Sequence, residues 1–242
     1  MGKDIDLNCD MGESYGRWTL GADADIMPFI SSASIACGFH GGDPHVMRGS
    51  VALAAAHGVA IGAHPSLPDL MGFGRRTMAV TPQELKDYFC YQTGALREFA
   101  RAAGIELQHV KAHGILTDMM EKDPALARAV GAAVQDSSDR KLIMVALAGG
   151  SAQRCFRAQG LRVAAEGFAD RAYNRDGTLV SRRLPGSLIE DPARAAEQAV
   201  RMATEGKVCT LDGADIALEV QTICCHGDTP GAVLIVRAVR EA

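Results

Sequence analysis

The stretch SIACGFHGGDP, residues 34–44, joins a short apolar run to a glycine-rich turn and then to an Asp-Pro step. The apolar run is typical of a buried strand. Asp43 before Pro44 is typical of a helix start, because the carboxylate caps the helix and Pro suits its first position. A plain turn needs fewer glycines, and a buried structural strand needs no histidine at its end. The stretch therefore predicts a strand, a turn and a helix, with His40 pointing into a functional mouth.

The same strand-to-helix pattern recurs along the chain. Short apolar or β-branched runs predict seven strands, at DIDLNC (4–9), SIAC (34–37), VAIGA (59–63), QHVKA (108–112), KLIMVAL (141–147), LRVAAE (161–166) and VQTICC (220–225). Helix starts with a capping oxygen followed by Pro stand at Asp43-Pro44, Thr81-Pro82, Asp123-Pro124, Asp191-Pro192 and Thr229-Pro230. Strands that alternate with helices predict an α/β fold with parallel strands. No linker or low-complexity tract interrupts the alternation, so residues 1–242 are expected to form one domain.

About seven parallel strands can close into an incomplete (β/α) barrel or open into a doubly wound sheet. A doubly wound sheet concentrates its site at one switch point, whereas a barrel collects side chains from nearly every strand end. Chemically active side chains follow six of the seven predicted strands here: Asp10 and Glu13; His40 and Asp43; His64; Lys111 and His113; Asp170 and Arg171; His226 and Asp228. We therefore expect a barrel with one mouth at the carboxyl ends of its strands.

Composition argues against several classes of protein. The 242 residues carry 25 basic and 29 acidic side chains without a basic run, so nucleic-acid binding is not expected. The stretch MGKDIDLNCDMGE at the start lacks the pattern of a signal peptide, and no long apolar span follows, so no membrane role is expected. Seven cysteines without a C-x-x-C pair are typical of reduced thiols. These features predict a cytoplasmic protein.

Four of the seven histidines stand at the ends of four different strands, a coincidence that unrelated structural roles do not explain. The histidines expected to meet at the mouth are His40, His64, His113 and His226. The histidines expected to be structural are His45, His57 and His109, which lie in helices or at a strand entrance. Lys111 has two interpretations, an anion or carbonyl clamp and a salt bridge to a neighbouring acid.

Loops beside the mouth offer further polar groups. Arg75 belongs to the stretch GFGRR (72–76), which could close over the mouth or present a solvated surface pair. Residues 171–190 form a long excursion that could fold as a hairpin lid. Asp43 and Asp228 stand near helix starts, where capping is at least as well supported as ligand binding.

The sequence motifs do not fully decide which cofactors the protein uses. The chain has neither the P-loop motif for ATP nor the G-x-S-x-G motif of serine hydrolases. Imidazole and carboxylate groups suit Zn, Mn or Fe. A divalent metal could be held by three or more of five side chains, namely Asp10, His40, His64, His113 and His226. No H-E-x-x-H motif or other local ligand pair accompanies them, so metal binding stays open.

Seven motifs follow one another along the chain: DLNCDMGE (6–13), IACGFHGGDP (35–44), GAHPSLPD (62–69), GFGRR (72–76), VKAHG (110–114), FADRAY (168–173) and CHGDTPGA (225–232). In sequence and order they resemble the A-subunit family of 5-oxoprolinase, also called LamB/YcsF, from end to end. The resemblance implies a barrel related to the glycoside hydrolase/deacetylase folds. It also implies a part in the ATP-dependent opening of 5-oxoproline to L-glutamate, together with the partner 5-oxoprolinase subunits B and C.

The resemblance further implies a set of functional residues. The family's motif positions correspond here to Asp6, Asn8, Asp10, Glu13, His40, Asp43, His64, Lys111, His113, Asp170, Arg171, His226 and Asp228. The chain departs from the usual family residues Asn, Pro, Tyr and Asn at Ser34, Ala112, Thr117 and Asp118. The resemblance therefore indicates the type of reaction, on 5-oxoproline or a related lactam, more firmly than the identity of the lactam.

These residues support a hypothesis for the reaction. A lactam amide is a poor electrophile, so coupling to ATP suggests that the carbonyl oxygen is phosphorylated before water attacks. Lys111 and the histidines would stabilise the developing charge, and Asp10 or Glu13 would orient or deprotonate the water. The expected catalytic residues are Asp10, Glu13, His40, His64, Lys111, His113 and His226. The expected substrate-binding residues are Asn8, Asp43, Arg75, Asp170, Arg171 and Asp228.

Two other functions are compatible with the same residues. The first is a metal-dependent deacetylase or amidohydrolase that acts without ATP. The second is a non-catalytic substrate-binding subunit whose partners carry out the chemistry, an interpretation supported by the missing P-loop motif.

Overall fold

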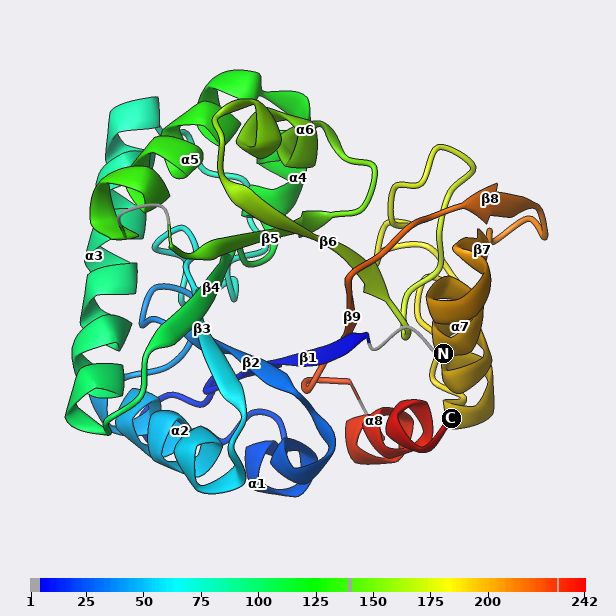
Figure 1. Ribbon diagram of the computed structural model, residues 1–242, viewed down its shortest axis with the longest axis horizontal. Helices are drawn as coiled ribbons and strands as arrows, with labels where there is room; N and C mark the ends of the chain where they lie inside the picture. Colours follow the sequence, from blue (N-terminus) through cyan, green and yellow to red (C-terminus); the bar gives the residue numbers. More distant parts are fainter. Residues whose placement is uncertain (1–4, 139–140, 230) are drawn as a thin grey trace.

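The computed structural model describes residues 5–138, 141–229 and 231–242. Within these residues, seven parallel strands close into a barrel in the order β1-β2-β3-β4-β5-β6-β9 (Figure 1). Their bounds are β1 (Asp6–Met11), β2 (Ser32–Ala36), β3 (Ala60–His64), β4 (Leu107–Lys111), β5 (Ile143–Leu147), β6 (Arg162–Phe168) and β9 (Thr222–Cys225). The ring closes because β9 pairs with β1 on one side and with β6 on the other. The predicted barrel is confirmed.

Helices surround the barrel and cover the outer faces of its strands (Figure 1). They are α1 (Asp23–Ile26), the 3₁₀ helix η1 (Met27–Phe29), α2 (Pro44–His57), α3 (Pro82–Ala102), α4 (Ile115–Lys122), α5 (Pro124–Ser138), α6 (Ser151–Ala158), α7 (Pro192–Glu205) and α8 (Ala232–Glu241). Outward strand residues such as Leu7, Ile35 and Ile61 are buried in one cluster with apolar residues of the helices. The hydrophobic core therefore fills the layer between barrel and helices.

Capping side chains account for four of the helix starts, those of α2, α3, α5 and α7. The carboxylate of Asp43 accepts backbone N–H groups at the start of α2, and Thr81 and Glu84 form a capping box at the start of α3. Asp123 and Asp191 accept backbone N–H groups at the starts of α5 and α7. These contacts agree with the predicted starts, since each of them depends on neighbouring residues alone.

The helix start predicted at Thr229-Pro230 is wrong. The helix α8 begins at Ala232, and its N-cap is Gly231 in a left-handed conformation at φ +77°. The N–H of Ala232 donates to the carbonyl of Thr229, so Thr229 takes part in a turn that precedes the helix. Pro230 lies outside the described residues.

The barrel interior is polar where the strands approach the mouth. Asp10 is buried and pairs with Lys111 from β4 across the interior, while its neighbours Cys9 and Met11 belong to the outer hydrophobic core. The strand β1 runs to Met11, two residues past its predicted apolar run, because Asp10 finds partners inside the barrel. An inward polar residue thus extends a strand that hydrophobicity alone would end earlier.

A glycine permits close packing inside the barrel. A Cβ placed on Gly62 of β3 would lie 2.2 Å from the ring of His109 in β4, so a larger residue would displace that ring. His109 is buried, and its Nε2 lies 3.2 Å from Ser34 Oγ. His109 therefore fills the interior as a packing residue.

Two segments depart from the repeating strand and helix pattern. Residues 171–190 turn back through isolated antiparallel bridges, Arg171 with Leu188 and Tyr173 with Leu179, and not through a long regular hairpin. The strands β7 (Lys207–Cys209) and β8 (Asp215–Ala217) form an antiparallel hairpin beside α7, which the sequence did not predict (Figure 1). No helix among the described residues has the length and apolar character to cross a membrane.

Candidate active site

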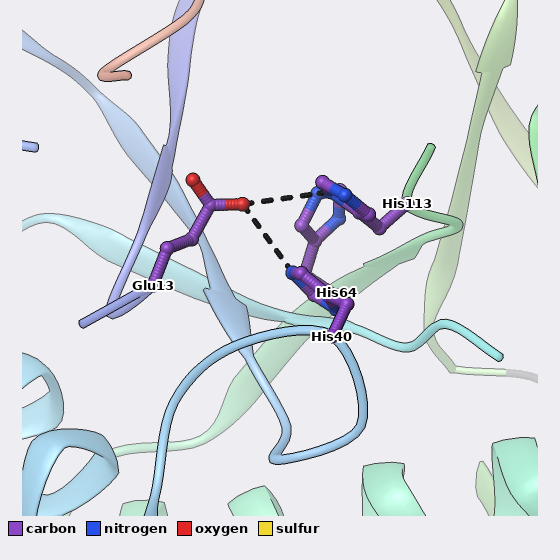
Figure 2. A group of neighbouring side chains, drawn as sticks. All are labelled: Glu13, His40, His64 and His113. Carbon is purple, nitrogen blue, oxygen red and sulfur yellow. Dashed lines mark hydrogen bonds and ion pairs between the residues drawn. The ribbon is translucent and has the colours of Figure 1, made fainter. Parts of the chain in front are cut away.

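Four buried side chains meet at the carboxyl ends of β1 to β4. Glu13 follows β1, His40 lies in the turn after β2, His64 ends β3 and His113 follows β4. Figure 2 shows them pointing toward one another, with Glu13 Oε1 3.3 Å from His40 Nε2 and 3.5 Å from His113 Nδ1. We call these four residues the histidine cluster. Three of the four histidines expected at the mouth therefore meet in it.

Backbone carbonyls fix the orientation of two of these rings. His64 Nδ1 lies 2.8 Å from the carbonyl oxygen of Lys111, and His113 Nε2 lies 2.9 Å from that of Phe73. A carbonyl oxygen only accepts, so these nitrogens each carry a proton. When both rings are neutral, the lone pairs of His64 Nε2 and His113 Nδ1 face each other at 3.0 Å, and a further proton on His64 Nε2 would face both His113 Nδ1 and Asp10 Oδ2. A shared proton or a bound cation would relieve this contact.

Burial disfavours charge on three residues of the histidine cluster, His40, His113 and Glu13. Burial lowers the pKa of His40 well below its usual value, and the charges of His113 and His64 lower it further. Burial also lowers the pKa of His113, whose ring stacks on that of His40 with 3.7 Å between centroids. Burial, together with the Asp10 charge, raises the pKa of Glu13 well above its usual value. Burial thus favours the protonated carboxyl of Glu13 and the neutral rings of His40 and His113.

The donor atoms of the histidine cluster suit a divalent metal. One ligand atom from each of the four residues lies within 4.8 Å of the others. Carboxylate and imidazole are ordinary ligands of Zn, Mn and Fe. The carbonyls behind His64 and His113 orient the rings in the way that outer hydrogen bonds orient metal-binding histidines. These residues could therefore hold such an ion.

A second buried group surrounds Lys111 inside the barrel. Its Nζ lies 2.8 Å from Asp10 Oδ1 and 2.7 Å from Glu166 Oε1. It also lies 3.1 Å from Asn8 Oδ1 and 3.1 Å from Cys224 Sγ. We call these five residues the lysine network. Because the three ammonium protons already face four acceptors, the geometry favours the salt-bridge interpretation of Lys111 over the clamp.

Asp10, Cys224 and His226 form another group whose ligand atoms lie within 4.8 Å of one another. The Lys111 ammonium contacts both Asp10 and Cys224, and its charge repels a cation at this position. Burial raises the pKa of the Cys224 thiol well above its usual value, which disfavours a thiolate ligand. Of the two groups, the histidine cluster is therefore the better metal candidate.

Asp10 connects the histidine cluster to the lysine network. Its Oδ2 lies 3.3 Å from His64 Nε2, while its Oδ1 pairs with Lys111. Burial opposes ionisation, but the charges of His64 and Lys111 outweigh it and hold the pKa of Asp10 well below its usual value. The pKa of Asp10 is thus shifted down where that of Glu13 is shifted up. Two neighbouring carboxyls whose pKa values are pushed apart are typical of sites that perform acid and base chemistry.

Glu166 of β6 is a buried site residue that sequence reasoning missed. It pairs with Lys111 and accepts a hydrogen bond from Asn8 Nδ2 at 3.1 Å. Asn8 also donates to Thr222 Oγ1 at 2.6 Å, so its amide is engaged inside the barrel and not offered to a substrate. One signal in the sequence was available, since Glu166 is the acidic residue that ends the apolar run LRVAAE. Ala165 before it faces the outer core, so Glu166 occupies an interior position.

The glycine-rich loop after β3 covers the histidine cluster. Phe73 adopts a left-handed conformation at φ +53°, and its ring packs edge-on against His40 and His113, with 5.6 and 5.0 Å between centroids. At the adjacent Gly74, a Cβ would lie 2.5 Å from Ser66 Oγ. Non-glycine residues rarely adopt this backbone conformation, and such residues concentrate at functional sites. The loop therefore encloses the cluster, as its place after β3 indicated.

Ion pairs join the loops around the mouth. Arg75 Nη2 lies 2.7 Å from Asp228 Oδ2, which links the loop after β3 to the loop after β9. Asp170 accepts from the backbone N–H of His226 at 2.9 Å, and its Oδ1 lies 2.9 Å from His226 Nδ1. Burial opposes ionisation of Asp170, but the contact with His226 outweighs it and lowers the pKa of Asp170. Asp170 therefore orients His226.

Two expected substrate-binding residues serve the fold. The carboxylate of Asp43 accepts three backbone N–H groups, two at the start of α2 and one from the loop after β1. The guanidinium of Arg171 donates to two backbone carbonyls of the segment 171–190, and burial lowers its pKa to about 10. Within the described part of the chain, neither residue contacts the histidine cluster.

The similarities to known proteins cover nearly the whole chain. The model of the LamB/YcsF family matches residues 5–242. The chain is 54% identical over 238 residues to the 5-oxoprolinase A subunit of Bordetella pertussis, covering 98% of this chain and 94% of that protein. It is 53% identical over 237 residues to the 5-oxoprolinase A subunit of Pyrococcus furiosus, with 98% and 92% coverage. The solved structure of a lactam utilization protein from Thermus thermophilus has a TM-score of 0.94, 49% identity and coverage of 99% and 95%.

Proposed function

The chain belongs to the LamB/YcsF family, and from this membership we propose that it is the hydrolytic subunit of a 5-oxoprolinase, which opens 5-oxoproline to L-glutamate with consumption of ATP. The observation that carries the proposal is the buried pair of carboxyls, Asp10 and Glu13, in contact with three converging imidazoles, with the pKa of Asp10 lowered and that of Glu13 raised. The names of the relatives, two 5-oxoprolinase A subunits and a lactam utilization protein, support the substrate class.

Asp10 and Glu13 divide the acid and base roles in this proposal. Opening a lactam requires water to add to the carbonyl carbon and the ring nitrogen to leave with a proton. The ionised Asp10 is suited to orient the water and accept its proton. Glu13, whose raised pKa favours the protonated carboxyl, is suited to give a proton to the leaving nitrogen. The sequence left these two roles undivided between the residues.

Lys111 acts through Asp10. Its protons are engaged by the lysine network, so it has no donor to spare for an oxyanion on the substrate. Its charge helps to keep the pKa of Asp10 low and holds that carboxylate in place. Lys111 is therefore a positioning residue in this mechanism, a role that differs from the oxyanion role expected from the sequence.

ATP use and assembly complete the proposal. ATP would supply the phosphoryl group that activates the lactam carbonyl, and we place its binding in partner subunits B and C, because this chain has no P-loop motif. The relatives' designation as A subunits supports an assembly of this kind. We also place the protein in the cytoplasm, since its cysteines are free thiols, as in a reducing compartment.

Release of ADP that depends on 5-oxoproline tests the proposal. The chain mixed with candidate subunits B and C is expected to release ADP and glutamate, and omission of any subunit is expected to abolish both. Asp10→Asn or Glu13→Gln should lower the rate about 10²- to 10⁴-fold. Normal rates in both variants would instead support the non-catalytic alternative, in which this chain only binds the substrate.

The facing lone pairs of His64 and His113 favour a second function, a metal-dependent amidohydrolase that acts without ATP. A divalent ion held by the histidine cluster would supply Lewis-acid polarisation of the lactam carbonyl. Glu13 would then be a ligand, and Asp10 would still orient the water. Elemental analysis that finds stoichiometric metal, with lactam hydrolysis by the chain alone that a chelator abolishes, would establish this function. Hydrolysis that strictly requires ATP would exclude it.

A further inference from the structure

Residues 171–190 are fixed to the end of β6 at both ends of the segment. The N–H of Ala172 donates to the carbonyl of Ser187 at 3.0 Å, and the N–H of Val180 donates to the carbonyl of Ala172 at 2.9 Å. The N–H of Ile189 donates to the carbonyl of Asp170 at 2.9 Å. Because these anchors directly follow β6, the turn 181–186 projects from the carboxyl end of that strand.

Arg182 lies in this turn and is half-buried. Within residues 5–138, 141–229 and 231–242, no hydrogen bond or ion pair engages its guanidinium. Neighbouring cations differ, because Arg75 pairs with Asp228 and Arg171 donates to two backbone carbonyls. Because the side chain is partly exposed, its unused N–H donors can bond water or a ligand that displaces the water. Arg182 thus has donors available for a ligand.

The charges that act on Arg182 belong to residues around the mouth. Burial lowers the pKa of Arg182 and the charge of Arg75 lowers it further, while Asp228 and Asp170 act in the opposite direction. After burial, the charge of Arg182 is the largest cause that lowers the pKa of Arg171. Three guanidiniums therefore act on one another at the rim. An anion among them would relieve their repulsion.

We propose that Arg182 binds a carboxylate of the substrate, so that the site selects lactams carrying an acid group over neutral lactams. The inference rests on the proposed function and deepens it, because 5-oxoproline combines a five-membered lactam with a carboxylate. The planar fork of a guanidinium matches the two oxygens of a carboxylate. Arg182 would hold the acid group while the lactam amide lies toward Asp10 and Glu13.

Two matched probes distinguish this role from general attraction of anions. The probes are 5-oxoproline and its uncharged carboxamide, which share the lactam ring and differ in the group that Arg182 would bind. Isothermal titration calorimetry on the full chain is expected to show about 10- to 100-fold tighter binding of the acid, the usual effect of a charge-assisted hydrogen bond. Arg182→Gln should remove the preference and leave the affinity for the carboxamide unchanged. Arg183→Gln, at the exposed neighbour, should keep it.

Other results would overturn the inference in distinguishable ways. Equal binding of acid and carboxamide by the wild-type chain, or a preference that survives Arg182→Gln, would remove the role of Arg182 and leave the lactam function standing. Equal losses in Arg182→Gln and Arg183→Gln would indicate a general charge effect and would also contradict the proposal. A wild-type chain that binds neither probe would contradict the proposed function, and the inference would fail with it. Circular dichroism of each variant would confirm that it is folded.

Discussion

The histidine cluster and the lysine network are adjacent and equally buried, yet they satisfy their polar groups differently. In the lysine network, the Lys111 ammonium has carboxylate partners in Asp10 and Glu166. In the histidine cluster, two ring lone pairs face each other, and His40 Nδ1 has no partner among the described residues. Buried polar atoms are normally satisfied, so the exceptions indicate a ligand or a reaction. The contrast assigns support of the site to Lys111 and Glu166 of the network, and chemistry to the cluster together with Asp10, which contacts both groups.

The largest expected effect is on turnover. His113→Asn removes the ring nitrogen that faces His64 and is expected to lower the rate about 10²- to 10⁴-fold, the usual contribution of a group that moves or stabilises a proton. The measurement is ADP release with 5-oxoproline in the complete assembly, and urea unfolding of the same variant is the control. A rate within tenfold of wild type would break the contrast by showing that the cluster is not catalytic.

The next effect is on stability and concerns the lysine network. Lys111→Met leaves the carboxylates of Asp10 and Glu166 buried without their counter-charge, which should lower the free energy of unfolding by about 3–5 kcal/mol. Urea denaturation measures this change. Lys86→Met is the matched control, because Lys86 pairs with Asp136 at the surface, where ion pairs contribute little. Equal free energies of unfolding for Lys111→Met and Lys86→Met would show that the lysine network does not stabilise the fold.

The third prediction concerns His109, a buried imidazole with a partner in Ser34. It tests the effect of burial on a histidine that lies outside the histidine cluster. Burial lowers the pKa of His109 from 6.5 to about 4. As the pH falls, the unfolded chain binds the proton first, so native stability falls between pH 6.5 and about 4 and levels off below. This difference corresponds to about 3 kcal/mol.

His109→Gln removes that titration. Its free energy of unfolding should therefore approach, or overtake, that of the wild-type chain as the pH is lowered from 7 to 4, a relative change of about 3 kcal/mol. Urea denaturation at several pH values follows it. Parallel pH profiles for the two chains would mean that the buried ring accepts a proton without penalty.

The smallest expected effect is at Asp43, which belongs to neither the histidine cluster nor the lysine network. Asp43 caps α2, so Asp43→Ala should lower the free energy of unfolding by about 1 kcal/mol and leave KM for 5-oxoproline unchanged. Thermal unfolding and steady-state kinetics measure the two quantities. A raised KM with unaltered stability would return Asp43 to the substrate-binding residues.

Local patterns predicted most of the elements and the rim of the site. Asp43 and Thr81 mark helix starts because capping involves residues a few positions apart. The strands β7 and β8 were missed, since each has only three residues and shows no usable periodicity. Glu166 was missed for another reason. Its partners Lys111 and Asn8 come from β4 and β1, which only the register of the closed barrel brings together with β6.

The sequence by itself determined the alternation of strands and helices, and therefore that His40, His64 and His113 stand at the same end of parallel strands. Periodicity and capping act over a few residues, so they can be read along the chain. Only the tertiary structure decided that the pKa of Asp10 is lowered while that of Glu13 is raised, and that the donors of Lys111 are engaged while those of Arg182 are not. Protonation and pairing depend on burial and on charges brought close by the closing of the barrel, and neither follows from the order of residues alone.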